Sequence, residues 1–173
     1  MSRVLNIKEV VRFMGAASPR SSAKVDLWGD CEKAIPEALA EFYAGLAKVP
    51  DFGERLAEPA EVDRLKRAQS DHWRALFAPT LPADVEARST RIGEVHVKIG
   101  LPSGWYMAGY AFLLKKLLPH LAKRHRFSPG AQAAAVELLI DRVFPDMILS
   151  NTAYENLVEA GRSQAAASDA DLG

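Results

Sequence analysis

Apolar residues recur at helical spacing along most of this chain, and the strict apolar–polar alternation of half-buried strands is rare. This pattern predicts helices over approximately 7–14, 22–33, 36–49, 59–77, 82–100, 103–125 and 129–161. At ~1.5 Å per residue, the last two helices would be about 33 Å and 48 Å long. The pattern therefore predicts an all-α protein in which the final two helices are the longest elements.

Residues that favour helix starts and turns set the predicted boundaries. Asn6 and Ser103 are expected to be N-caps, because short polar side chains accept the first free N–H groups of a helix. Residues 51–58 are expected to form a connector with at most one helical turn. The small, polar residues 163–173 are expected to be a tail or a shortened linker, so that the domain covers residues 1–162.

Composition is that of an ordinary globular domain and argues against several partners. The chain has 173 residues, enough for one domain with a sizeable core. Lysine and arginine total 22, as do aspartate and glutamate, so the charge favours neither nucleic acid nor an anionic membrane as a partner. The lone Cys31 excludes an intrachain disulfide and favours a cytoplasmic location. No segment has the pattern of a signal peptide or a membrane span.

His96 lies on the apolar face of its predicted helix. Ile92, His96 and Ile99 are spaced i, i+4 and i+7, whereas Glu94 and Lys98 lie on the opposite side, where they can pair in solvent. An inward histidine is either a core residue bonded to a carbonyl or a metal ligand. Helix geometry alone leaves both interpretations open.

Two tyrosines share this ambiguity. Tyr106 follows His96 by ten residues across a Gly-Leu-Pro turn. It could bring its hydroxyl to the imidazole as a partner for the second ring nitrogen, or it could be a core aromatic. Tyr43 lies on the apolar face of the predicted helix 36–49, where a buried phenol must find a hydrogen-bond partner. It could equally extend its hydroxyl to the surface.

Gln69 and His72 interrupt the apolar face of the helix that contains Leu65. Such polar groups suggest either a cavity with polar contents or a helix edge that meets water. His72 is the rival of His96 as a metal ligand, and the sequence favours His96. His120 and His125, near the end of their helix, are expected to be solvated charges that suit the helix dipole.

The sequence lacks the motifs of several other chemistries. It has no Glu-x-x-His pair of di-iron bundles and no His-Glu-x-x-His zinc motif. Walker-type loops, Gly-x-Gly-x-x-Gly and the Gly-x-Ser-x-Gly elbow are absent too.

Three motifs stand in order along the chain: Phe42-Tyr43-x-x-Leu46, then Leu65-Lys66-x-x-Gln69-x-x-His72-Trp73-x-x-Leu76-Phe77, and finally Ile92-Gly93-x-x-His96-x-x-Ile99-Gly100-Leu101-Pro102-x-x-Trp105-Tyr106. Together they resemble the sensor globins of globin-coupled sensors, which are related to protoglobins. The resemblance covers about residues 5–160, and it is the combination of motifs that makes it specific.

This resemblance implies a globin fold with an extra N-terminal helix and no separate D helix. It implies haem b (iron protoporphyrin IX) as cofactor, with His96 as the proximal iron ligand. On the distal side it implies Tyr43 as hydrogen-bond donor, with Leu65 and Gln69 beside the ligand. The remaining residues expected around the haem are Phe42, Phe52, His72, Val95, Ile99, Trp105 and Tyr106.

The resemblance also implies a role in gas sensing. The expected partners are dioxygen, or carbon monoxide or nitric oxide, and a second copy bound through the last two helices. The globin domain itself is expected to carry no catalytic residue. The family usually adds a C-terminal output module, so this chain is expected to be a single-domain member or part of a longer protein.

Three alternatives stay open at this point. The first is a haem-free sensor globin that acts as an interaction module. The second is a haem enzyme, such as a nitric oxide dioxygenase or a peroxidase. The third is an inert helical dimerisation domain, which predicts no absorbance beyond that of the protein.

Overall fold

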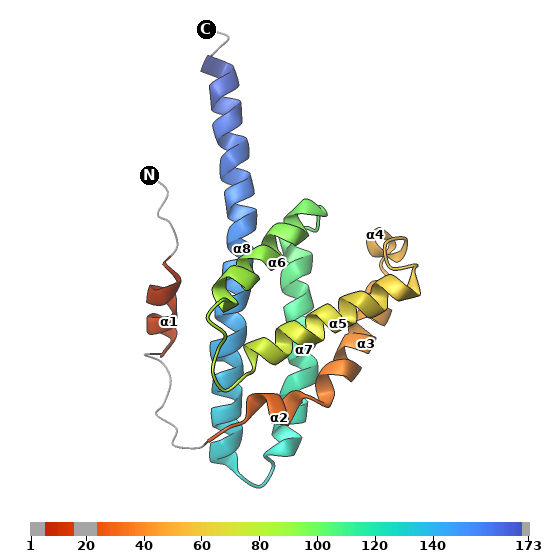
Figure 1. The fold of residues 1–173 in the computed structure, drawn as a ribbon, viewed down its shortest axis with the longest axis vertical. Helices are drawn as coiled ribbons and strands as arrows, with labels where there is room; N and C mark the ends of the chain where they lie inside the picture. Colours follow the sequence, from red (N-terminus) through yellow and green to blue (C-terminus); the bar gives the residue numbers. More distant parts are fainter. Residues whose placement is uncertain (1–5, 16–23, 171–173) are drawn as a thin grey trace.

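The computed structural model describes residues 6–15 and 24–170, which contain helices and no strand. Figure 1 shows the helices in chain order. They are α1 (Ile7–Gly15), α2 (Leu27–Cys31), α3 (Ala34–Leu46), α4 (Pro50–Gly53), α5 (Pro59–Leu76), α6 (Val85–Lys98), α7 (Ser103–Arg124) and α8 (Pro129–Ala170). The predicted all-α class is confirmed.

Local chemistry accounts for the helix starts at the N-terminal end. The Asn6 side chain accepts a hydrogen bond from the Lys8 N–H at 3.1 Å, as expected of an N-cap. Asp26 caps α2 in the same way, through the Gly29 N–H at 3.0 Å. Helix α2 spans only Leu27–Cys31, shorter than the predicted 22–33, of which residues 22–23 lie outside the described part.

Two predicted boundaries of the long helices are wrong. Ser103 is the first residue of α7 and not its cap, because Pro102 occupies the cap position and no side chain bonds there. Helix α8 continues past Gly161 to Ala170, so residues 163–170, expected to be a tail, are helical. An exposed helical glycine costs only about 1 kcal/mol, which a long helix tolerates. The end of α8 extends beyond the other helices (Figure 1).

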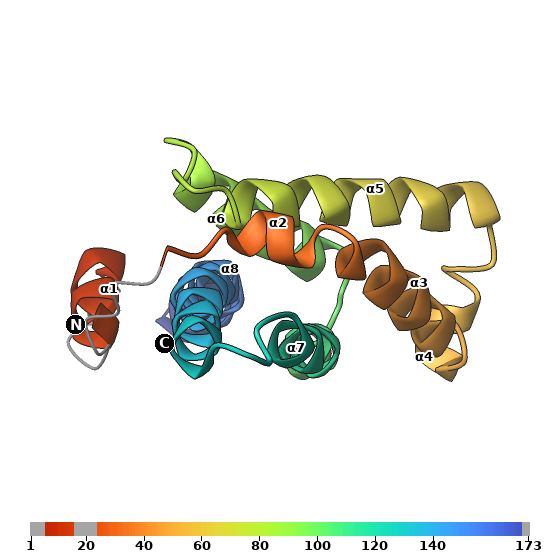
Figure 2. The same cartoon turned by 90° about the horizontal axis from the view of Figure 1, so that it is seen from below.

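The two longest helices lie side by side and the others pack against them. Figure 2 shows α7 next to α8, α5 on the opposite side of the molecule, and α1 against α8 on the side away from α7. Helix α6 crosses α8, and α3 packs between α5 and α7 (Figure 1). No described helix is both long and apolar enough to cross a membrane.

The core is a continuous cluster of apolar side chains from α2, α3, α5, α7 and α8. Trp73 and Phe77 pack edge to face with ring centroids 5.2 Å apart, the geometry that aromatic quadrupoles favour. The fully or nearly fully buried members are Leu27, Ile35, Leu39, Trp73, Leu76, Phe77, Leu117, Leu121, Leu139 and Val143. This core sets the positions of α3, α5 and α7, which carry much of the candidate site.

Candidate functional site

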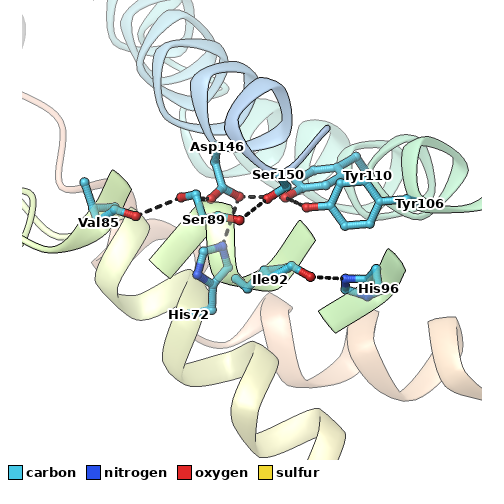
Figure 3. A network of polar contacts seen from close by, with 9 residues as sticks. All are labelled: His72, Val85, Ser89, Ile92, His96, Tyr106, Tyr110, Asp146 and Ser150. Atoms are coloured by element: carbon cyan, nitrogen blue, oxygen red, sulfur yellow. Dashed lines mark hydrogen bonds and ion pairs between the residues drawn. The ribbon is translucent and has the colours of Figure 1, made fainter. Parts of the chain in front are cut away.

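His96 lies in the last turn of α6 with one ring nitrogen occupied. Its Nδ1 is 2.8 Å from the carbonyl oxygen of Ile92, one turn earlier (Figure 3). A carbonyl only accepts, so Nδ1 carries the hydrogen and the neutral ring keeps its lone pair on Nε2. That nitrogen makes no hydrogen bond to any residue that the structure describes. The ring is therefore oriented and has one nitrogen available for a ligand.

The environment of His96 keeps its ring neutral. Burial lowers the pKa of the imidazole, and the bond to Ile92 offsets this only in part. A histidine binds a metal through a neutral ring nitrogen, whose partner nitrogen is commonly fixed by a carbonyl. In His96 the ring is neutral and Nδ1 is bonded to a carbonyl, so both conditions are met without a ligand.

Tyr106 contacts the imidazole through its ring and not through its hydroxyl. The ring centroids of His96 and Tyr106 are 4.8 Å apart, with planes at 52°. The Tyr106 hydroxyl instead lies 2.9 Å from that of Tyr110. The structure therefore supports Tyr106 as a core aromatic that packs beside the imidazole.

Apolar side chains around His96 are unusually open to solvent. Val95 and Ile99 are 50% and 48% exposed, and Trp105, at the start of α7, is 39% exposed. Trp105 packs edge to face on Phe52 of α4 at 5.2 Å, and Arg55 donates to the Ile99 carbonyl at 2.7 Å. Exposed apolar side chains therefore lie at the end of α6 and at the start of α7, and Trp105 also contacts the buried Phe52.

Tyr43, on α3, is a buried phenol that stays protonated. It is 6% exposed and packs edge to face against Phe42, with ring centroids 5.1 Å apart. Burial raises the pKa of Tyr43 to about 12, and the nearby Arg64 offsets this only in part. Its hydroxyl makes no hydrogen bond to any described residue. At neutral pH it is a donor without a partner from the described chain.

Helix α5 supplies Leu65 and Gln69, both half-buried. The amide oxygen Oε1 of Gln69 is buried and has no hydrogen-bond partner among the described residues. Buried polar atoms in folded proteins nearly always have partners, so this oxygen indicates a missing polar group. No hydrogen bond or ring contact joins Gln69 or Tyr43 to His96 within the described ranges.

His72 pairs with a carboxylate of α8. Its Nε2 lies 3.0 Å from Oδ2 of Asp146 on α8, and its ring is 6.3 Å from that of Trp73 (Figure 3). The side chain of Asp146 is 1% exposed. The structure therefore shows His72 in a polar pair with a buried carboxylate.

His120 and His125 also differ from their prediction as solvated charges. The Nε2 of His120 is 2.8 Å from the Asp30 carbonyl oxygen, and that of His125 is 2.6 Å from Asp30 Oδ2. Both histidines are half-buried, and Arg124 adds a contact at 3.2 Å to the same carboxylate. These contacts attach α2 to the end of α7. The sequence could not show them, because the partners are about ninety positions apart.

The arrangement as a whole defines a class. An all-helical fold in which a histidine keeps one ring nitrogen free, with a buried phenol on another helix, is compatible with a globin. The protoglobin family model matches residues 5–159, and the chain belongs to this family.

A solved structure supports the same fold. The chain is similar to the globin domain of the Geobacter sulfurreducens globin-coupled sensor, with a TM-score of 0.69 and 19% sequence identity. The match covers 86% of this chain and 95% of that one. At this identity the likeness shows the fold, which is the globin fold.

Globins imply haem, and the residues present fit it. His96 would provide a neutral nitrogen ligand. Val95, Ile99 and Trp105 provide exposed apolar surface that a porphyrin would cover. On the other side, the free polar atoms of Tyr43 and Gln69 suit a small polar ligand. A neutral histidine and uncovered apolar side chains are compatible with haem.

Proposed function

We propose that this chain is a haem-based gas-sensing domain that binds a diatomic gas, foremost dioxygen. The observation that carries this proposal is His96, whose imidazole is neutral, oriented by the Ile92 carbonyl and free at Nε2 beside uncovered apolar side chains. His96 thus combines a free ring nitrogen with exposed apolar neighbours, which is what an iron ligand of haem needs.

The haem would be held by His96 alone, without covalent attachment to the chain. Haem iron supplies the site at which a diatomic gas binds, and His96 supplies the proximal nitrogen. Cys31 is the only cysteine of the sequence, and it is fully buried. Thioether attachment needs a Cys-x-x-Cys-His motif, which the chain lacks. We therefore assign haem b.

On the distal side, Tyr43 would donate a hydrogen bond to the gas. Its hydroxyl keeps its proton because burial raises its pKa to about 12. A hydrogen bond to a ligand that carries partial negative charge is worth about 1–3 kcal/mol. Carbon monoxide is the less polar of the two ligands, so a phenol donor at this position would favour dioxygen.

The signal would leave through a dimer formed by α7 and α8. These two helices present large apolar side chains to solvent, and such patches mark interaction sites. The exposed residues are Met107, Leu118, Ile140, Phe144, Leu157 and Val158. A second copy packed on these faces would form a four-helix bundle, and small helix shifts at such interfaces are a common switching device.

The decisive experiment is replacement of His96. The His96→Gly variant should lose the Soret band of reconstituted protein, and added imidazole should restore it by filling the space left at the iron. The matched control is His120→Gln, which keeps an amide N–H for the Asp30 carbonyl and should bind haem normally.

Two outcomes would overturn the proposal. Wild-type protein that takes up no haem would favour the haem-free interaction module. An unchanged Soret band in the His96→Gly variant would remove His96 as ligand.

A further inference from the structure

A single buried carboxylate joins four helices next to the haem site. Asp146 of α8 is 2% exposed. Its Oδ1 accepts a hydrogen bond from the Ser89 hydroxyl of α6 at 2.5 Å. Its Oδ2 accepts from the Tyr110 hydroxyl of α7 at 2.6 Å and pairs with His72 of α5 at 3.0 Å (Figure 3). No sequence motif singled out this residue.

The network continues to the proximal histidine. The Tyr110 hydroxyl, which donates to Asp146, is also 2.9 Å from the Tyr106 hydroxyl, so the Tyr106 hydroxyl donates to that of Tyr110. The Tyr106 ring then packs against the His96 imidazole, with centroids 4.8 Å apart. A continuous chain of contacts therefore runs from the carboxylate to the imidazole. Asp146 itself makes no hydrogen bond or ion pair with His96.

Stability alone does not explain a carboxylate here. Burying an ionised group is costly, and buried ionic networks are often no more stable than well-packed apolar replacements. What such a network adds is direction, because each hydrogen bond holds its partner at a defined distance and angle. The partners held here lie one each on α5, α6 and α7.

We propose that Asp146 is a positioning residue, which holds the Tyr106 ring through Tyr110 and so sets the orientation of the His96 imidazole. Because Asp146 belongs to α8, a displacement of α8 is transmitted to the imidazole along the same contacts, and the reverse. The positioning can be measured without haem. Only its effect on iron rests on the proposed function.

The first test uses haem-free protein with carbon-13 labelled histidine and tyrosine. Asp146→Asn keeps the shape of the side chain and removes its charge, and Tyr110→Phe removes only the linking hydroxyl. The control is Asp141→Asn, an exposed carboxylate on the same helix. We expect the ring resonances of Tyr106 and His96 to move in both network variants and to stay in place in the control.

The same variants then test the effect on the cofactor. In the ferrous haem protein, the iron–histidine stretching band in the Raman spectrum should shift for Asp146→Asn and Tyr110→Phe, with equal haem content, and should not shift for Asp141→Asn. A general loss of packing would reduce haem content without moving the band of the protein that remains loaded. If Asp146→Asn does not fold, Tyr110→Phe carries both tests, because it keeps the ring in the core.

The outcomes separate this inference from the proposed function. His96 resonances that respond to Tyr110→Phe no more than to Asp141→Asn would overturn the positioning role, whatever the haem content. Resonances that move as expected in a protein that takes up no haem would support the positioning role and contradict the proposed function.

Discussion

At the scale of single residues, burial and hydrogen bonds together set the pKa values of His96, Tyr43 and Asp146. Burial favours the neutral form of all three side chains. The ring of His96 and the phenol of Tyr43 are neutral, so that His96 can bind a metal and Tyr43 can donate a hydrogen bond. Asp146 is the exception. Burial raises its pKa, but the bonds from His72, Ser89 and Tyr110 more than offset this, and its pKa is lowered overall.

The phenol of Tyr43 gives the first prediction at this scale. Tyr43→Phe should speed dioxygen dissociation roughly 5- to 150-fold, because about 1–3 kcal/mol of hydrogen bonding is lost. Carbon monoxide dissociation should change less. Stopped-flow measurements check both rates. The control is Tyr154→Phe, which removes a buried hydroxyl that has no partner among the described residues. Equal dioxygen rates in Tyr43→Phe and wild type would exclude Tyr43 as the donor.

The lowered pKa of Asp146 predicts how stability depends on pH. The unfolded chain takes up this proton near the ordinary value of 3.8, and the folded chain takes it up at a lower pH. The stabilisation is therefore fully present above the unfolded value and is lost as pH falls through the folded one. Urea denaturation from pH 6 downward should show a smaller loss in Asp146→Asn than in wild type. Parallel curves would contradict an ionised, hydrogen-bonded Asp146.

At the scale of helices, the crossing of α6 and α8 determines where the proximal histidine lies. A Cβ atom built on Gly93 would be 1.9 Å from the Ser150 carbonyl oxygen, so the two backbones meet at a point that only glycine allows. The Ser150 hydroxyl also donates to the Ser89 carbonyl at 2.7 Å across the same crossing. His96 lies less than one turn beyond this point, and Arg55 holds the end of its helix.

Gly93→Ala should therefore force α6 and α8 apart. Overpacking of this kind costs typically about 1–3 kcal/mol, and here the obstacle is backbone, which cannot rotate away. Urea denaturation should show the loss, together with weaker haem retention. Gly104→Ala is the control, since nothing lies within 4 Å of its added methyl group. A variant at Gly93 as stable as that control would disprove the close crossing.

At the scale of the whole molecule, α8 connects the site with the surface. Its buried face carries Asp146 and Ser150, which contact α5, α6 and α7. Ile140 and Phe144, on the same helix, are exposed. A dimer built on this outer face would share one rigid helix with the proximal network. That arrangement suits a sensor, because a helix shift changes the interface and the site together.

If α8 forms part of the dimer, substitutions on its exposed face should weaken self-association, and substitutions outside α7 and α8 should not. Phe144→Glu should weaken self-association by about 2 kcal/mol or more, roughly 30-fold in the dissociation constant, because charge would be buried at an apolar interface. Sedimentation equilibrium measures this directly. Leu81→Glu is the matched control, an exposed leucine outside α7 and α8. A monomeric wild type, or equal effects of both variants, would contradict the dimer.

Local sequence patterns were enough to predict the helices and the face on which His96 lies. Helical periodicity is local, so residues a few positions apart, such as Ile92 and His96, reveal their common side without any tertiary information. The three motifs likewise indicated the family before the fold was known. What local signals missed were ends that depend on context, such as the Ser103 cap and the continuation of α8 past Gly161.

Only the tertiary structure decided which polar groups meet. Asp30 pairs with His120 and His125, and Asp146 with His72 and Ser89, across 57 to 95 positions of sequence. A single sequence does not show which of these residues meet, because any of several acceptors could pair with any histidine. Packing of the apolar faces chooses the neighbours, and desolvation then makes the chosen hydrogen bonds obligatory. That is why the sequence could place His96 on an inner helix face, whereas the network around Asp146 emerged only from the fold.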